Sequence, residues 1–156
     1  MLKEGQKAPG FRLSSAEGGS VSLEDFRGKP VVLYFYPKDD TPGCTREACA
    51  FRDQYAHIEK TGAVVLGVSP DSVSSHEKFR DKHKLSFPLL SDPDKQVAKK
   101  FGAYGEKTLY GKKVVGMIRS TFVIDGAGVV RKVFPKVRVD GHAEQVLETL
   151  RALGSR

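Results

Sequence analysis

The strongest constraint on the fold is a continuous apolar run of six residues, Val31–Tyr36, that ends at Pro37. An uninterrupted run of β-branched and aromatic side chains is typical of a strand buried on both faces of a mainly parallel sheet. A loop has to follow, because Pro37 and Pro42 have no backbone N–H for the ladder and Gly43 permits unusual backbone angles. No apolar run is longer, so none approaches the roughly 20 residues that span a bilayer, and we expect no membrane partner.

The segments after this strand alternate between helical and strand-like patterns. Thr41 can cap a helix and Pro42 suits its first turn, and apolar residues then recur at spacings of three and four. The predicted elements are a helix at 41–60, a strand at 63–69, a helix at 72–84, a short strand at 87–90 and a helix at 91–102 with Ser91 or Asp92 as its cap.

The C-terminal part predicts a hairpin and a final helix. Two strand-like runs within 120–134 flank a turn at Asp125–Gly128, so we expect them to be antiparallel. Residues 144–153 place apolar residues on one stripe of an amphipathic helix, and residues 101–119 are expected to be loops. This order predicts an α/β fold with a central mixed sheet flanked by helices, in a single domain over 1–156.

Cysteine content and charge narrow the function. Two cysteines in 156 residues make no disulfide framework, and the N-terminus carries no secretion signal. We therefore expect a cytoplasmic chain whose cysteines serve redox chemistry or metal binding. The net charge is +7, but the lysines and arginines are spread along the chain. This favours a solvated basic surface and no nucleic acid partner, and a basic nucleic-acid-binding module stays the non-enzymatic alternative.

Cys44 stands where the loop ends and the helix starts, near the first free backbone N–H groups. This position favours an anion by about 0.3–1 kcal/mol. A thiol needs roughly 3 kcal/mol to be mostly ionised at neutral pH. The helix alone is too weak, so a cation from elsewhere in the chain has to approach the sulfur. Arginine suits this role better than lysine, because it stays charged and presents a fork of fixed donors.

The residues around Cys44 carry a resemblance to a known family. Residues 37–44, Pro-Lys-Asp-Asp-Thr-Pro-Gly-Cys, resemble the active-site signature of the peroxiredoxins. The continuation Thr-Arg-Glu-Ala-Cys at 45–49 is similar to the subgroup called bacterioferritin comigratory protein or peroxiredoxin Q, whose resolving cysteine lies five residues after the peroxidatic one. Further similar segments, from 5–9 to 119–125, extend the resemblance over nearly the whole chain.

This resemblance implies a thioredoxin-like fold and a thiol-dependent peroxidase. The Cys44 thiolate would attack hydrogen peroxide or an organic hydroperoxide and become a sulfenic acid. Arg119 would supply the missing cation, and with the Thr41 hydroxyl it would orient the peroxide and stabilise charge on the departing oxygen. Pro37 would shape the pocket, and Glu47 would hold the arginine.

The resemblance also implies how the cycle closes. Cys49 would resolve the sulfenic acid of Cys44 as an intramolecular disulfide, and thioredoxin would reduce that disulfide. No cofactor and no metal are implied, and monomers are common in this subgroup.

Helix geometry adds a condition on this disulfide. Positions five apart in an α-helix have Cα atoms about 8.5 Å apart, whereas a disulfide tolerates no more than about 7 Å. We therefore expect Cys44 and Cys49 to share one helix in the reduced chain, and the first turns of that helix to unwind when the bond forms.

Two other site types stay open. A metal site could combine Cys44, Cys49 and His57, although the C-x4-C spacing is at the edge of zinc patterns and a second close pair of ligands is missing. A general disulfide oxidoreductase is the competing enzyme class. It is disfavoured because such enzymes usually place two residues between their cysteines, and this chain has four.

The remaining polar residues have simpler interpretations. Asp39 and Asp40 lie in a proline-bounded loop and are expected to be solvated. Three scattered histidines are expected at the surface or at helix ends: His76, His83 and His142.

Overall fold

A computed structural model describes residues 1–154, and the predicted domain end at 156 lies outside the described residues. A mixed sheet holds strands in the order β2-β1-β5-β4-β3-β8-β9. Its strands are β1 (Arg12–Ser15), β2 (Ser20–Ser22), β3 (Val31–Phe35), β4 (Val64–Ser69), β5 (Leu89–Ser91), β8 (Ser120–Ile124) and β9 (Val130–Phe134). β3, β4 and β5 are parallel, and β8 runs antiparallel to β3.

The apolar run at 31–36 forms the middle of this sheet, as predicted. Every residue of β3 is buried, with β4 on one side and β8 on the other. Alternate side chains enter two cores, with Val32 and Tyr34 on one face and Leu33 and Phe35 on the opposite face. The loop that follows β3 therefore leaves from the centre of the sheet.

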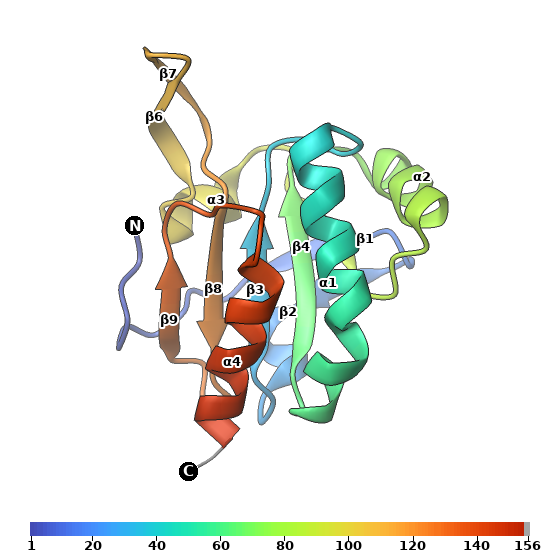
Figure 1. Cartoon of the computed structure of the whole chain (residues 1–156), viewed down its shortest axis with the longest axis vertical. Coiled ribbons are helices and arrows are strands. Elements are labelled where there is room, and N and C mark those ends of the chain that lie inside the picture. The colour runs from blue at the N-terminus through green and yellow to red at the C-terminus, as the bar shows by residue number, and fades with distance from the viewer. Residues whose placement is uncertain (155–156) are drawn as a thin grey trace.

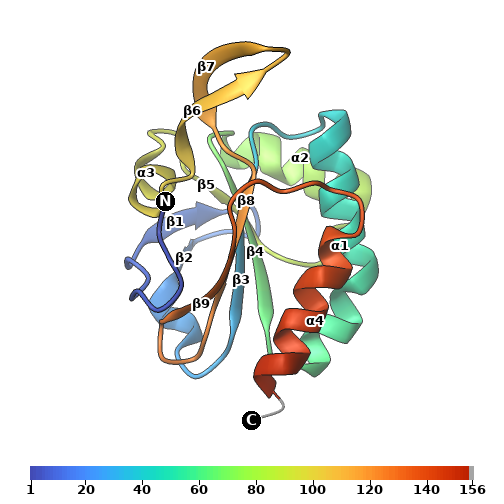
Figure 2. The same cartoon turned by 60° about the vertical axis from the view of Figure 1, so that its left-hand side comes forward.

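Helices cover both faces of the sheet. α1 (Pro42–Lys60) and α4 (His142–Gly154) pack against each other on one face, with α2 (Val73–His83) beside them (Figure 1). α3 (Gln96–Phe101) and the short helix η1 (Leu23–Phe26) pack on the other face (Figure 2). Across the described chain, no helix is long and apolar enough to span a membrane. The prediction of an α/β fold with a central mixed sheet flanked by helices is confirmed.

The helix predicted at 91–102 is shorter than expected. Ser91 ends β5, and α3 begins only at Gln96. Asp92 still satisfies free donors at the start of α3, because its carboxylate accepts from the Ala98 N–H (3.0 Å). Asp92 therefore caps α3 as predicted, but a turn that was expected to be helical separates it from the first residue of α3.

Residues 101–119, expected to be loops, contain a hairpin instead. β6 (Tyr104–Leu109) pairs with β7 (Lys112–Met117) in a two-stranded sheet that projects from the body of the molecule (Figure 1). Tyr110 and Gly111 form its turn, both at positive φ (52° and 77°). The prediction was wrong because polar and charged residues occupy both strands. The hairpin has no buried face, so its sequence lacks the alternation of apolar and polar residues that indicates a strand.

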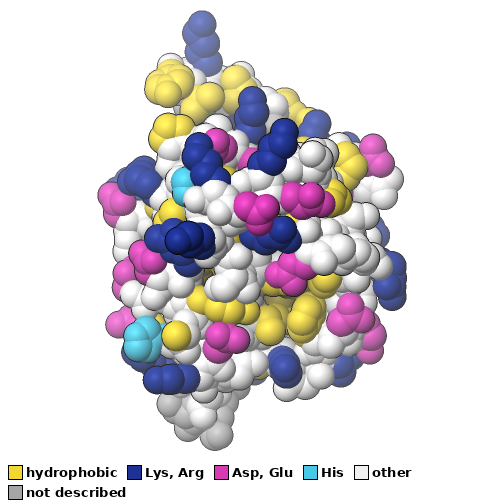
Figure 3. Space-filling model, turned by 90° about the vertical axis from the view of Figure 1, so that its right-hand side faces the viewer, with side chains coloured by type: hydrophobic (Ala, Val, Ile, Leu, Met, Phe, Trp, Pro, Cys, Tyr) yellow, Lys and Arg dark blue, Asp and Glu magenta, His cyan; other side chains and the backbone are white. Residues whose placement is uncertain are grey.

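Exposed apolar side chains gather on this hairpin. Among the described residues, the large apolar side chains that are exposed include Leu109, Tyr110 and Val115. Figure 3 shows hydrophobic atoms at the top of the molecule, where the hairpin projects, and interspersed basic and acidic side chains below. The mixed charges agree with the expectation of a solvated basic surface.

Gly67 in β4 generates a prediction about packing. A Cβ at Gly67 would lie 2.9 Å from Tyr34 Oη and 3.0 Å from a methyl group of Leu89. Tyr34 has no room to shift, because its buried ring stacks on Phe51 with centroids 4.9 Å apart. We expect Gly67→Ala to lower the free energy of unfolding by about 1–3 kcal/mol in chemical denaturation.

Gly10→Ala is the matched control, because nothing lies within 4 Å of a Cβ at this exposed glycine. It should change the free energy of unfolding by less than about 0.5 kcal/mol. Equal losses in both variants would contradict the packing argument.

Candidate active site

Strand register brings Arg119 to the start of α1. β8 pairs with β3 so that Ser120 lies opposite Phe35, the last residue of β3. Arg119 immediately precedes Ser120, so it lies at the edge of the sheet from which the loop to α1 emerges. Its carbonyl accepts a hydrogen bond from the Val137 N–H (3.0 Å), which holds the backbone in place.

The start of α1 leaves backbone donors free beside Cys44. Thr41 is the N-cap residue, and the Thr45 N–H makes the first intrahelical bond to its carbonyl (2.8 Å). The N–H groups of Gly43 and Cys44 precede that bond. The Thr41 side chain does not cap them, because its hydroxyl donates to the Lys38 carbonyl (2.8 Å). Two donors at the positive end of the helix dipole are therefore available to an anionic oxygen.

Arg119 provides the cation that the ionisation argument required. Its Nη2 lies 3.2 Å from Cys44 Sγ, and its Nη1 lies 2.6 Å from Glu47 Oε1. Gly43 makes room for the guanidinium, since a Cβ there would be 3.2 Å from Nη2. Burial lowers the pKa of Arg119, but the neighbouring charges of Glu47 and Cys44 raise it above its ordinary value. Arg119 is therefore charged throughout the physiological pH range.

Glu47 is a buried carboxyl with only one oxygen satisfied. Its side chain is 1% exposed, and Oε2 has no hydrogen-bond partner among the described residues. Burial raises the pKa of Glu47 from 4.5 to about 7, although the charge of Arg119 opposes this shift. The short contact with Arg119 thus compensates only in part for the loss of water around the carboxyl.

The other residues predicted for the site lie in α1 or in the loop before it. Thr41 occupies the N-cap position without a side-chain cap, Pro37 opens the loop, and both are partly exposed. Cys44 and Cys49 are free thiols in the same helix, as expected for the reduced chain. Cys44 is buried, whereas Cys49 is partly exposed. The two sulfurs therefore face different surroundings in this state.

A buried polar network that the sequence analysis missed ties the loop before α1 to α2. Asp39 Oδ2 lies 2.6 Å from His76 Nδ1, and Asp39 Oδ1 accepts from the Tyr36 hydroxyl (2.6 Å). His76 Nε2 bonds to the Leu90 carbonyl (2.9 Å). Both side chains are buried, so the expectations of a solvated Asp39 and a surface His76 were wrong. One signal was present, because His76 precedes the core residue Phe79 by three positions on α2.

Asp40 adds a second tie at the surface. It pairs with Lys82 (2.9 Å) and with His83 (3.3 Å) near the end of α2. Hydrogen bonds from these two residues hold the pKa of Asp40 below its usual value. Asp40 is exposed, as expected, and its backbone lies at positive φ (59°). Two adjacent loop residues are thus fixed to the same helix.

The same region contains a possible metal-ligand group. Among the described residues, ligand atoms of Asp39, Asp71 and His76 all lie within 4.8 Å of one another. Hydrogen bonds already occupy these atoms, since Asp71 Oδ2 accepts from the Asp39 N–H (2.8 Å) and from the Ser69 hydroxyl (2.6 Å). A metal ion would have to displace these donors, so we interpret the group as a structural link.

His142 is the first residue of α4, which agrees with the expectation of a histidine at a helix end, but its side chain is buried. Its Nε2 lies 2.8 Å from the Thr121 hydroxyl oxygen, and its ring packs edge-on against Phe51 and Phe134. Burial lowers the pKa of His142 to about 4, although a hydrogen bond that His142 donates to Gln145 opposes this shift. A neutral imidazole therefore fills part of the core beneath α1.

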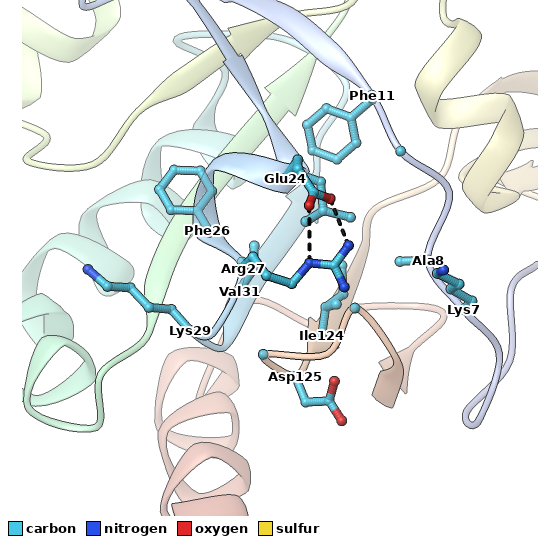
Figure 4. Close-up of a pocket in the computed structure, with 14 residues that line it drawn as sticks. Lys7, Ala8, Phe11, Glu24, Phe26, Arg27, Lys29, Val31, Ile124 and Asp125 are labelled. Atoms are coloured by element: carbon cyan, nitrogen blue, oxygen red, sulfur yellow. Dashed lines mark hydrogen bonds and ion pairs between the residues drawn. The ribbon is translucent and has the colours of Figure 1, made fainter.

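A cavity of about 260 Å³ lies at the opposite end of β3 from Cys44. Its lining includes Val31, the first residue of β3, and Ile124 (Figure 4). Arg27 and Glu24 form an ion pair of 2.7 Å beside it, so their charges compensate each other. None of the residues predicted for the site lines this cavity, which is therefore separate from it.

Comparisons with known proteins agree on one class. The model of the AhpC/TSA family matches residues 4–133. A putative peroxiredoxin bcp of Coxiella burnetii is 52% identical over 149 residues, which cover 96% of this chain and 99% of that protein. Peroxiredoxin Bcp of Bacillus subtilis is 46% identical over 155 residues, which cover 99% of both chains.

Solved structures extend the agreement to the fold. The bacterioferritin comigratory protein of Xanthomonas campestris matches with a TM-score of 0.87 at 43% identity, over 92% of each chain. A cysteine-to-serine variant of PrxQ from Xylella fastidiosa matches with a TM-score of 0.91 at 38% identity, over 98% of each chain. The thioredoxin-like fold expected from the resemblance is confirmed.

The raised pKa of Glu47 predicts a pH dependence of stability. A carboxyl whose pKa rises from 4.5 to about 7 on folding contributes stability that is complete below pH 4.5 and is lost as the pH rises to about 7. Glu47→Gln keeps this side chain neutral at every pH. The free energy of unfolding of the parent chain should therefore fall relative to Glu47→Gln, by on the order of 2–3 kcal/mol between pH 4 and 8.

Chemical denaturation of both chains across this pH range measures the difference. His142 titrates in both chains, so its contribution cancels. A parent chain that becomes more stable relative to Glu47→Gln as the pH rises would contradict the prediction, because it would mean that the ion pair with Arg119 outweighs the burial of Glu47.

Proposed function

Because this chain belongs to the AhpC/TSA family, in the group of Bcp and peroxiredoxin Q proteins, we propose that it reduces hydrogen peroxide and organic hydroperoxides with Cys44 as the reacting thiol. The observation that carries this proposal is the 3.2 Å contact between Arg119 Nη2 and the buried Cys44 Sγ. A guanidinium and a helix N-terminus both stabilise a thiolate, which is the nucleophilic form of cysteine. The Xanthomonas campestris relative is described by its alkyl peroxide reduction activity, which supports the same substrate class here.

In the first step, the Cys44 thiolate attacks one peroxide oxygen and the O–O bond breaks. The sulfur is oxidised to a sulfenic acid, and the departing oxygen takes up a proton and leaves as water or an alcohol. Negative charge develops on that oxygen during the step. Arg119 and the free N–H groups of Gly43 and Cys44 stabilise this charge, in the way that an oxyanion hole does.

Three further residues support this step. Glu47 holds one arm of the guanidinium, so that the other arm stays directed at the sulfur. The Thr41 hydroxyl donates its hydrogen to the Lys38 carbonyl, so its oxygen serves as an acceptor for the peroxide O–H. Pro37 bounds the pocket without adding a backbone donor that would compete with Arg119.

In the second step, the Cys49 thiol attacks the Cys44 sulfenic acid, a disulfide forms and water leaves. Both cysteines lie in α1, where positions five apart are too distant for a disulfide. The first turns of α1 therefore unwind in each cycle. The partial exposure of Cys49 supports this role, since a reductant can reach the Cys49 sulfur of the disulfide.

Thioredoxin is the proposed reductant, and thiol–disulfide exchange with it returns both cysteines to the thiol state. This assignment rests on the family and on the two cysteines of the chain. We also propose that the chain works in the cytoplasm, as a monomer and as one domain over 1–156. Thiol chemistry of this kind needs no bound cofactor.

Variants of the first step test the peroxidase assignment. Cys44→Ser should abolish peroxide consumption, because no thiolate remains at the pocket. Arg119→Ala should slow single-turnover oxidation of Cys44 by about 10²–10³-fold in stopped-flow measurements, since a charge-stabilising donor is lost. Arg46→Ala, an exposed arginine on the same helix, is the control and should leave the rate within about twofold. Full activity in Cys44→Ser would refute the assignment.

A variant of the second step tests the role of Cys49. Cys49→Ser should keep a fast first turnover with peroxide but lose cycling with thioredoxin, because chemistry at Cys44 survives and resolution does not. Mass spectrometry of the parent chain after one equivalent of hydrogen peroxide should show the loss of two hydrogens without a dimer. A covalent dimer, or thioredoxin-supported cycling in Cys49→Ser at the parent rate, would rule out the intramolecular disulfide.

A further inference from the structure

Lys107 differs from the other lysines of the hairpin. Its neighbours Glu106 and Thr108 are exposed, and so are Lys112 and Lys113 on the opposite strand, whereas Lys107 is partly buried. Its Nζ donates a hydrogen bond to the Met117 carbonyl at the base of β7. The hairpin therefore turns one ammonium group inward.

The path of this side chain leads to the candidate active site. The register pairs Lys107 with Val114, so reaching Met117 takes the side chain three residues along β7, toward the body of the molecule. It passes over Gly116, where a Cβ would be 3.5 Å from Lys107 Cε and 3.8 Å from Nζ. Arg119 follows Met117 by two residues, and Figure 2 shows β7 running down into β8 at this point.

The site carries a net negative charge when both of its acidic groups are ionised, and a second cation would balance it. When Glu47 is ionised and Cys44 is a thiolate, two negative charges share the single positive charge of Arg119. All three groups are removed from water to a large extent, so an unbalanced negative charge there is costly. One further positive charge nearby makes the sum neutral.

The charges of Arg119 and Cys44 both act on Lys107. Burial lowers the pKa of Lys107, and Arg119 lowers it further, whereas the charge of Cys44 raises it. An ammonium group that is affected by both partners of the Arg119–Cys44 contact also acts on them, because electrostatic interaction energies are mutual.

We propose that Lys107 is the second cation of the peroxidase site, held by the β6–β7 hairpin so that its charge favours the Cys44 thiolate without touching the sulfur. This inference rests on the proposed function and deepens it. Lys107 acts as a supporting residue through its charge, and the hairpin sets its distance from the sulfur. A hairpin that shifts outward carries the ammonium with it and weakens the thiolate.

Alkylation of Cys44 tests this directly, because iodoacetamide reacts with the thiolate and needs no peroxide. The background is Cys49→Ser, so that Cys44 is the sole thiol, and mass spectrometry follows the rate between pH 4 and 9. Lys107→Gln removes the charge and keeps a hydrogen-bond donor, and Lys107→Arg keeps both. Lys112→Gln, an exposed lysine of the same hairpin, is the matched control.

Removing the charge at Lys107 destabilises the thiolate, so half-maximal alkylation should need a higher pH. We expect Lys107→Gln to move that midpoint up by about half to one pH unit and to slow alkylation at pH 6 about threefold to tenfold. Lys107→Met should behave like Lys107→Gln. Lys107→Arg and Lys112→Gln should stay within about twofold of the background.

Two results would overturn the inference. One is an unchanged alkylation profile in Lys107→Gln and Lys107→Met. The other is an equal upward shift in Lys107→Gln and Lys107→Arg, which would mean that the contact with Met117 matters and the charge does not. Peroxide consumption by the parent chain is measured separately, so a failure of the proposed function is distinguishable from a failure of this inference.

Discussion

The site depends on one guanidinium that two buried acidic groups share. Arg119 contacts both the sulfur of Cys44 and the carboxyl of Glu47, and the two acidic groups lie one helical turn apart on α1. The sheet fixes the arginine and the helix fixes its partners, so the contact exists only while β8 keeps its register on β3. Gly43 then decides how closely the guanidinium approaches the helix. The contact between Arg119 and the Cys44 thiol is thus a property of the whole β3–α1–β8 arrangement.

Sharing has an electrostatic consequence. A carboxyl with a pKa of about 7 is neutral in a large fraction of molecules near neutral pH, and in those molecules Arg119 serves the sulfur alone. In the remainder, the carboxylate competes for the same positive charge. Glu47 therefore holds the arginine in position, and when it is ionised it also weakens the interaction of Arg119 with the Cys44 sulfur.

The fold was largely predictable from the sequence, and the site only in part. The apolar run of β3 and the capping pattern of α1 identified the strand, the loop and the helix that position Cys44. The need for a cation followed from comparing the free energy that ionises a thiol with the smaller contribution of a helix N-terminus. The identity of this cation as Arg119 came from the family resemblance. The hairpin was missed because its strands bury little, and the buried pair Asp39 and His76 was missed because its partners lie 37 residues apart. Pairings of this kind are set by tertiary contacts, which local patterns do not encode.

Two ties hold the loop before α1 against α2. Asp39 and Asp40 lie just before α1, and their bonds to His76 and Lys82 involve no residue of that helix. In the proposed cycle, unwinding of the first turns of α1 would therefore start downstream of this fixed loop. On the proposed oxidation, the sulfur of Cys44 would move toward Cys49 while the loop that begins at Pro37 stays tied to α2. After the proposed reduction, α1 would refold against a loop that had stayed in place, so the position of Arg119 and of the loop would not have to be rebuilt in each cycle.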